Sequence, residues 1–202
     1  MTIEDFISGF LGASALEMTA SVCGFICVFL IIKRNIWCFF FGLIQVTLFA
    51  YIFFNIKLYS NAGLHVVFMG LQIYGWWNWT HHRDNQEQLI VEAGTPKLAG
   101  LSAAVALLSA LALGTYMDRY TDASFAYLDA FITCASLVAQ VLLTKRYMFN
   151  WLFWMVVNVV AIYVYLQKGL YPTSLLYVTF LVMCVFGYYS WWKQYKLQQE
   201  VT

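Results

Sequence analysis

Residues 14–32, SALEMTASVCGFICVFLII, form an almost uninterrupted apolar run in which Glu17 is the only charged residue. The polar triplet Lys33-Arg34-Asn35 follows, and a second apolar run, IWCFFFGLIQVTLFAYIFF, occupies residues 36–54. A helix needs about 20 apolar residues to cross the hydrocarbon core of a bilayer. The two runs therefore predict two membrane-spanning helices, and the short gap between them predicts that these helices are antiparallel.

The composition of the whole chain supports a membrane protein. Hydrophobic residues make up 62% of the 202 residues and charged residues only 10%, against about 45–50% and about 25% in soluble proteins. These values exclude a water-soluble domain and a disordered chain. The net charge of +1 gives no field that would attract nucleic acid.

Short clusters of polar and charged residues divide the rest of the chain into similar runs. We predict an all-α integral membrane protein with seven transmembrane helices. Their expected ranges are Ser14–Ile32, Ile36–Phe54, Tyr59–Trp79, Leu98–Tyr116, Ala126–Leu143, Tyr147–Leu166 and Pro172–Trp192.

An internal repeat relates the first three predicted helices to the last three. A shift of 112 residues places Lys33-Arg34 on Lys145-Arg146, Gly75 on Gly187 and Trp79 on Trp191. We interpret residues 14–79 and 126–192 as three-helix repeats and residues 98–116 as a linker helix. This 3+1+3 order makes the repeats parallel, as in sugar-transporting SWEET proteins, which place a substrate between their halves near the midplane.

The distribution of basic residues predicts the orientation. Lys57, Arg119 and Lys168 lie on the side of the N-terminus, whereas eight Lys and Arg residues lie on the other side. Because basic residues are enriched in cytoplasmic loops, we expect a multi-pass protein of the inner membrane with its N-terminus outside and its C-terminus in the cytoplasm.

Polar side chains inside the predicted helices indicate a binding site. An unpaired amide in hydrocarbon is costly, so such groups are expected to pair with each other or to face a wet cavity. Several of them share one helix face, and interhelical hydrogen bonding is the alternative explanation. The amide and imidazole candidates are Gln45, Asn61, His65, Gln72, Gln140, Asn150 and Asn158.

Tryptophans extend this pattern. Trp151 and Trp154 share a predicted helix with Asn150 and Asn158, and an indole beside amides suits a flat, cationic heteroaromatic ligand; simple packing of the indoles is the alternative. Five further tryptophans at the predicted cytoplasmic helix ends are interpreted as residues of the membrane interface: Trp76, Trp77, Trp79, Trp191 and Trp192.

The chemistry of the helices favours passive transport over catalysis. The spans carry acidic residues only near their ends, at Glu17 and Asp129, and ion-coupled carriers usually need a deeper carboxylate. No catalytic motif is present. We expect no enzyme activity, no cofactor and no metal site, and the five cysteines are interpreted as small packed residues.

Three stretches resemble the Pnu-type vitamin transporters, the nicotinamide riboside transporter (PnuC) family with its thiamine-transporting PnuT relatives. They are FFGLIQVTLFAYIFFNIKLY at 40–59, QIYGWWNW at 72–79 and NWLFWMVVNVVAIYVYLQKGLYPTSLLY at 150–177. The pattern NWxxWxxxN, from Asn150 to Asn158, is the most specific part. The resemblance implies a SWEET-like fold, a homotrimer, and uptake of a water-soluble vitamin by facilitated diffusion followed by trapping through a cytoplasmic kinase.

By the same resemblance Asn150, Trp151, Trp154 and Asn158 line the substrate site, and we add Tyr177 at the end of the third stretch. Gln45, His65 and Gln72 differ from the nicotinamide riboside pattern, and this difference favours thiamine slightly over nicotinamide riboside. Two other interpretations stay open at this point: a SWEET-like sugar facilitator, and a membrane receptor or assembly subunit that transports nothing.

Overall fold

The computed structural model describes residues 15–55, 57, 59–82, 89–121 and 125–201. This part of the chain forms seven helices, which confirms the predicted all-helical membrane protein. Six of them are long and apolar enough to cross a membrane. The seventh, α4, has 23 residues but is not among these six. The helices are α2 (Ala15–Ile32), α3 (Trp37–Asn55), α4 (Tyr59–His81), α5 (Pro96–Tyr120), α6 (Ala126–Thr144), α7 (Asn150–Gln167) and α8 (Tyr171–Val201).

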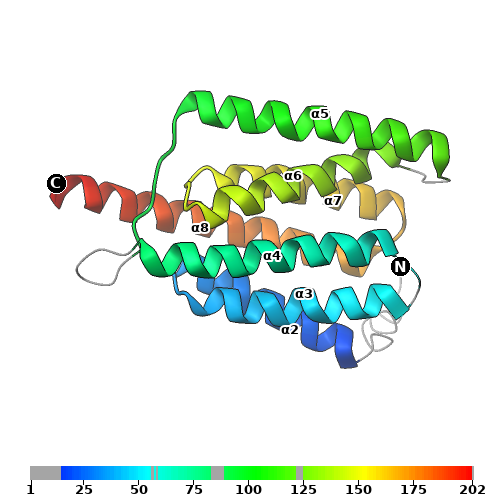
Figure 1. The fold of residues 1–202 in the computed structure, drawn as a ribbon, viewed down its shortest axis with the longest axis horizontal. Helices are drawn as coiled ribbons and strands as arrows, with labels where there is room; N and C mark the ends of the chain where they lie inside the picture. The colour runs from blue at the N-terminus through cyan, green and yellow to red at the C-terminus, as the bar shows by residue number, and fades with distance from the viewer. Residues whose placement is uncertain (1–14, 56, 58, 83–88, 122–124, 202) are drawn as a thin grey trace. The chain divides into compact units, whose positions relative to one another are not determined.

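Most helix ends lie within a few residues of the predicted boundaries, but α8 is longer. It continues to Val201, nine residues past the predicted end, and Figure 1 shows its C-terminal end extending beyond the α6–α7 turn. Hydropathy marks where an apolar run ends, whereas a helix continues wherever its polar residues are good helix formers. Near the end of the apolar run, Lys196 Nζ lies 4.2 Å from the centroid of the Trp192 ring.

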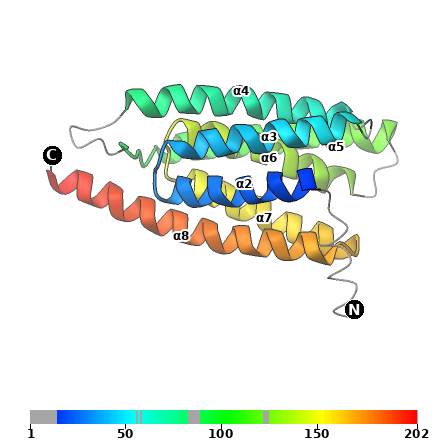
Figure 2. The same ribbon diagram turned by 90° about the horizontal axis from the view of Figure 1, so that it is seen from below.

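The described chain forms two compact units, one within Met1–Ile90 and one within Val91–Thr202. In the first unit α3 packs against both α2 and α4 and lies between them in Figures 1 and 2. In the second unit each helix packs against the next one along the chain, in the order α5, α6, α7, α8.

The turns of the two units are alike. Arg34 and Arg146, 112 residues apart, both adopt left-handed backbone conformations, with φ of 56° and 66°. Each follows its helix in a Schellman motif, in which Asn35 N donates to Leu30 O and Tyr147 N donates to Leu142 O. The left-handed residues Lys57 and Gly169 are related by the same shift. The local backbone therefore follows the sequence repeat, while the predicted division into segments 14–79, 98–116 and 126–192 and the parallel SWEET-like arrangement stay predictions.

Two buried aromatic pairs also recur at this spacing. Phe39 and Trp79 pack edge to face with ring centroids 4.9 Å apart, and Trp151 and Trp191 do so at 5.8 Å. Trp79 and Trp191 are completely buried. The interpretation of these two residues as part of an interfacial belt is wrong, because each indole fills a helix–helix contact instead.

Helix α5 packs on α6 through small residues. Ser102, Ala106, Ala110 and Gly114 are buried at four-residue intervals, so they share one helix face. A Cβ at Gly114 would lie 2.6 Å from the Tyr127 ring, which shows how closely the two helices approach. The α5 residues Leu101, Leu108 and Leu111 are more than half exposed.

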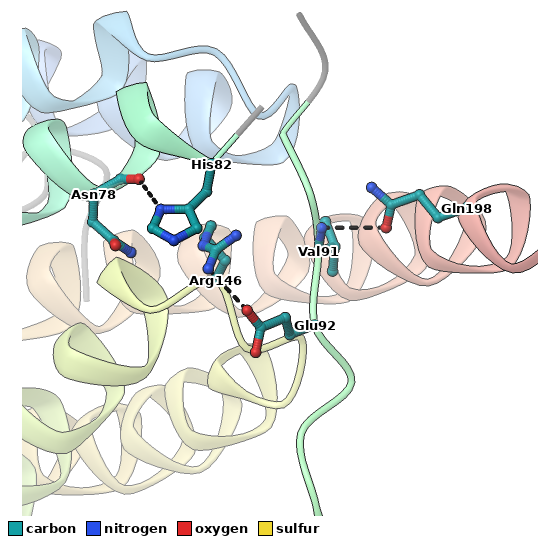
Figure 3. A network of polar contacts seen from close by, with 6 residues as sticks. All are labelled: Asn78, His82, Val91, Glu92, Arg146 and Gln198. Carbon is teal, nitrogen blue, oxygen red and sulfur yellow. Dashed lines mark hydrogen bonds and ion pairs between the residues drawn. The ribbon is translucent and has the colours of Figure 1, made fainter. Parts of the chain in front are cut away.

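A short extended segment, residues 91–95, leads into α5 and is bonded to the rest of the second unit (Figure 3). Glu92 forms an ion pair with Arg146 at 2.8 Å, and its backbone exchanges hydrogen bonds with Arg146 O and Met148 N. Val91 N donates to Gln198 Oε1 of α8 at 3.2 Å. The extension of α8 beyond its apolar part thus contributes to holding this segment.

Figure 3 also shows the end of the first unit, where His82 Nδ1 lies 2.9 Å from Asn78 O.

In the second unit Gly94 has a φ of 74°, and a Cβ there would lie 2.2 Å from Phe149 Cε1. Both its left-handed conformation and this close approach require glycine.

We expect Glu92→Ala to lower the thermal stability of the protein more than Asp129→Ala does. The side chain of Arg146 is 7% exposed and loses an ion-pair partner in the first variant, whereas Asp129 and Lys168 are about 30% exposed. Removing a partner of a buried charge costs about 1–3 kcal/mol, and an exposed pair contributes about 0–1 kcal/mol. Thermal unfolding in detergent, followed by tryptophan fluorescence, measures the melting temperature of both variants. An equal or larger decrease for Asp129→Ala would contradict the conclusion that the ion pair of Glu92 with Arg146 contributes more to stability.

Candidate functional site

The two asparagines of α7 are both buried and both use their amide nitrogen locally. Asn150 Nδ2 donates to Tyr147 O at 2.7 Å. Asn158 Nδ2 donates to Trp154 O at 2.8 Å and approaches Cys184 Sγ of α8 at 3.5 Å. Each asparagine is thereby held in one orientation, with Asn158 also linked to the neighbouring helix.

The two indoles between these asparagines have different surroundings. Trp151 is 2% exposed and lies directly on Gly187, where a Cβ would meet its ring at 2.4 Å. Trp154 is only partly buried and packs on the apolar cluster of Ala106, Ala135 and Val157. Trp151 is thus enclosed by α8, whereas Trp154 is half-buried.

Several buried polar atoms of the second unit have no hydrogen-bond partner among the described residues. Gln140 Nε2 lies one turn before the end of α6, and Asn150 Oδ1 and Trp151 Nε1 lie at the start of α7. A buried donor or acceptor without a partner costs about 1–3 kcal/mol. These two donors and one acceptor are therefore candidates for hydrogen bonds to a polar ligand.

In the first unit the predicted residues of α3 and α4 lie at closely packed contacts. Gln45 of α3 lies over Gly24 of α2, and Gln72 of α4 lies over Gly42 of α3. Gln72 is buried and Gln45 is half-buried. Asn61 belongs to the first turn of α4, and its side chain lies outside the described part of the structure.

His65 lies among phenylalanine rings. Its ring centroid is 5.1 Å from that of Phe53, 5.7 Å from that of Phe49 and 6.1 Å from that of Phe68. The second unit repeats this arrangement around Tyr177, whose ring is 5.2 Å from Tyr165 and 6.2 Å from Phe180. Because Phe53, His65 and Phe68 correspond to Tyr165, Tyr177 and Phe180 under the 112-residue shift, His65 and Tyr177 occupy equivalent places in their units.

The structure adds residues that the sequence patterns did not indicate. Gly24, Gly42 and Gly187 lie against the side chains of Gln45, Gln72 and Trp151. A glycine within an apolar helix is a sequence signal for such close approaches. Phe49 and Phe53 are spaced four residues apart before the turn that precedes α4. That spacing indicates a shared helix face, but it does not indicate that His65 lies against it.

No group of three His, Cys, Asp or Glu residues in the described part of the chain has the arrangement of a metal site. The five cysteines are all buried and form no disulfide. Cys184 contacts Asn158, as described above.

The sequence of the chain matches the model of a known protein family. The model of the nicotinamide mononucleotide transporters matches residues 14–193. The chain belongs to this family. Its membership confirms the resemblance to Pnu-type vitamin transporters inferred from residues 40–59, 72–79 and 150–177.

Individual proteins resemble the chain over most of its length. The nicotinamide riboside transporter PnuC of Escherichia coli (strain K12) is 30% identical over 203 residues, which cover 88% of this chain and 85% of that protein. The PnuC of Neisseria mucosa is 31% identical over 194 residues, which cover 91% of this chain and 74% of that protein. The riboflavin/roseoflavin transporter RibM of Streptomyces davaonensis is 24% identical over 183 residues, which cover 87% of this chain and 84% of that protein.

A solved structure has the same fold. The crystal structure of the vitamin B3 transporter PnuC superposes with a TM-score of 0.76 and 29% sequence identity, covering 96% of this chain and 87% of that one. Together with the seven helices, this similarity identifies the chain as a multi-pass membrane protein of a transporter family.

Variants on one face of α7 distinguish ligand contacts from packing. We expect Trp154→Ala and Asn158→Leu to weaken vitamin binding by about tenfold each, because a stacked cationic ring gains about 0.5–2 kcal/mol and tenfold corresponds to 1.4 kcal/mol. Trp151→Ala should lower the melting temperature most, because removing a fully buried Trp costs about 3–5 kcal/mol. Affinity and melting temperature are measured on the same purified variants. Unchanged affinity in both Trp154→Ala and Asn158→Leu would refute their assignment to the site.

Proposed function

We propose that this protein is a facilitative membrane transporter for a flat, heteroaromatic B-vitamin, with nicotinamide riboside as the first candidate. The observation that carries the proposal is the set of unpaired buried polar atoms on Gln140, Asn150 and Trp151, in a chain whose family members are transporters. Groups of this kind offer hydrogen bonds to a carboxamide or a ribose. The partly exposed indole of Trp154 offers a face on which a cationic ring stacks.

The order of candidate substrates rests on two observations. Relatives similar over most of the chain are named for nicotinamide riboside, and this places nicotinamide riboside first. Thiamine is the second candidate, because it is also flat and cationic and because Gln45, His65 and Gln72 differ from the nicotinamide riboside pattern. Riboflavin is included as the third, since RibM is named for riboflavin and roseoflavin.

We propose that transport is uncoupled and that phosphorylation by a cytoplasmic kinase traps the vitamin. The acidic residues of the described helices support this, because all of them lie near helix ends: Glu17 in the first turn of α2, Asp129 in the first turn of α6, Asp118 near the end of α5 and Glu200 near the end of α8. Asp129 is also paired with Lys168 at 3.0 Å. None of these four carboxylates lies in the middle of a helix, where an ion-coupled carrier usually binds its driving ion.

The proposal includes an inner-membrane location, a homotrimer and a SWEET-like 3+1+3 arrangement with the N-terminus outside. The excess of Lys and Arg on one side of the helices supports the orientation. Because the five native cysteines are buried, a Lys33→Cys variant offers one reactive thiol to an impermeant reagent. It should stay unlabelled in intact cells and react after the cells are opened; labelling from outside would reverse the orientation.

Uptake into proteoliposomes tests the transport activity itself. We expect radiolabelled nicotinamide riboside to enter until its concentration is equal on both sides, with no response to a proton or sodium gradient. Enclosing a purified vitamin kinase and ATP should raise the accumulated label severalfold, because the phosphorylated product no longer equilibrates. Empty liposomes and excess unlabelled thiamine, riboflavin and glucose are the controls.

Three outcomes of this assay would change the proposal. Accumulation driven by either ion gradient would exclude facilitated diffusion. Competition by glucose but by none of the vitamins would favour the sugar facilitator. Entry of no vitamin and no sugar would favour the receptor or assembly subunit.

A further inference from the structure

Two glutamine side chains of the first unit lie against glycines of the preceding helix. A Cβ built on Gly24 would lie 2.7 Å from Gln45 Nε2, and a Cβ built on Gly42 would lie 2.3 Å from Gln72 Nε2. Both distances are shorter than a real Cβ contact permits. Each amide therefore occupies the volume that any side chain at the glycine would fill.

The helix backbone itself gives no reason for these glycines. Gly24 and Gly42 lie inside α2 and α3, where glycine is less favourable than alanine. Both are buried, and neither has the positive φ seen at Gly94 and Gly169. The close approach of an amide is the feature that requires them.

The second unit fills the equivalent places differently. Under the 112-residue shift Gly42 corresponds to Trp154 and Gln72 to Cys184. The small residue thus lies on the middle helix of the first unit but on the last helix of the second. The pairing of an amide with a glycine belongs to the first unit, and the accessible indole belongs to the second.

We propose that Gly24 and Gly42 are positioning residues, which hold the amides of Gln45 and Gln72 where they bind the polar groups of the substrate. This inference rests on the proposed function. The amide groups of both glutamines lie directly against these glycines, and an amide carries both donors and acceptors with which it can bind a ligand. A methyl group at either glycine displaces the amide while changing little else, because the atom that it meets is the end of a flexible side chain.

A double-mutant cycle tests this coupling for Gly42. We expect Gly42→Ala to weaken binding of nicotinamide riboside by about two- to tenfold, the range of one lost hydrogen bond. In a Gln72→Ala background, Gly42→Ala should have no further effect, because the residue acts only through the amide. Gly70→Ala in α4 is the matched control, since a Cβ there meets nothing within 4 Å. Gly24→Ala with Gln45→Ala forms the parallel cycle.

Affinity is measured by calorimetry with nicotinamide riboside, thiamine and riboflavin, and melting temperature is measured on each variant. An effect of Gly42→Ala that persists at full size in the Gln72→Ala background would overturn the inference, because it would then arise from helix packing. Unchanged affinity in both Gly42→Ala and Gln72→Ala would overturn it too.

A second measurement separates this inference from the proposed function. In protein labelled with ¹⁵N at glutamine, the side-chain NH₂ signal of Gln72 should shift in Gly42→Ala and stay in place in Gly70→Ala, with no ligand added. If the signal shifts but the wild-type protein binds none of the three vitamins, the proposed function fails while the positioning of Gln72 by Gly42 stands. An unshifted signal overturns the positioning itself.

Discussion

Water is absent from the hydrocarbon core of a membrane, so each polar group placed there must find a partner within the protein or in a ligand. The backbone of this chain meets the requirement through its helices, and the turns meet it through Schellman motifs at Arg34 and Arg146. The side-chain amides are only partly paired. Asn158 is bonded through its nitrogen, whereas Gln140 Nε2 and Asn150 Oδ1 have no partner in the described chain. These incompletely paired amides are the physical basis of the proposed site.

The two units share local features and differ in their interior. Equivalent left-handed residues, aromatic pairs and ring clusters recur at a spacing of 112 residues. The residues around these features have diverged: the first unit has amides on glycines, and the second has asparagines and accessible indole surface.

The sequence predicts the helices well because hydropathy and helix length both follow from the thickness of the bilayer. It predicts the repeat because turn residues such as Lys33-Arg34 and Lys145-Arg146 occur in register. It does not predict that Trp79 and Trp191 are buried, since lipid and protein interiors are equally apolar and hydropathy does not distinguish them. Helical spacing places Gln45 and Gln72 on helix faces, but their contacts with Gly24 and Gly42 depend on how neighbouring helices pack. The sequence therefore selects the side chains of the candidate site, and the structure is needed to show what each one contacts.

Equilibrium binding to the purified protein tests the central claim most directly, that buried amides and an accessible indole form a site for a flat heteroaromatic vitamin. We expect saturable binding of nicotinamide riboside with one site per chain, quenching of tryptophan fluorescence, and a melting temperature that rises with ligand concentration, since a ligand that binds only the folded state stabilises it. Thiamine should compete for the same site, and glucose should not. Absence of binding and of any thermal shift with nicotinamide riboside, thiamine and riboflavin would contradict the account.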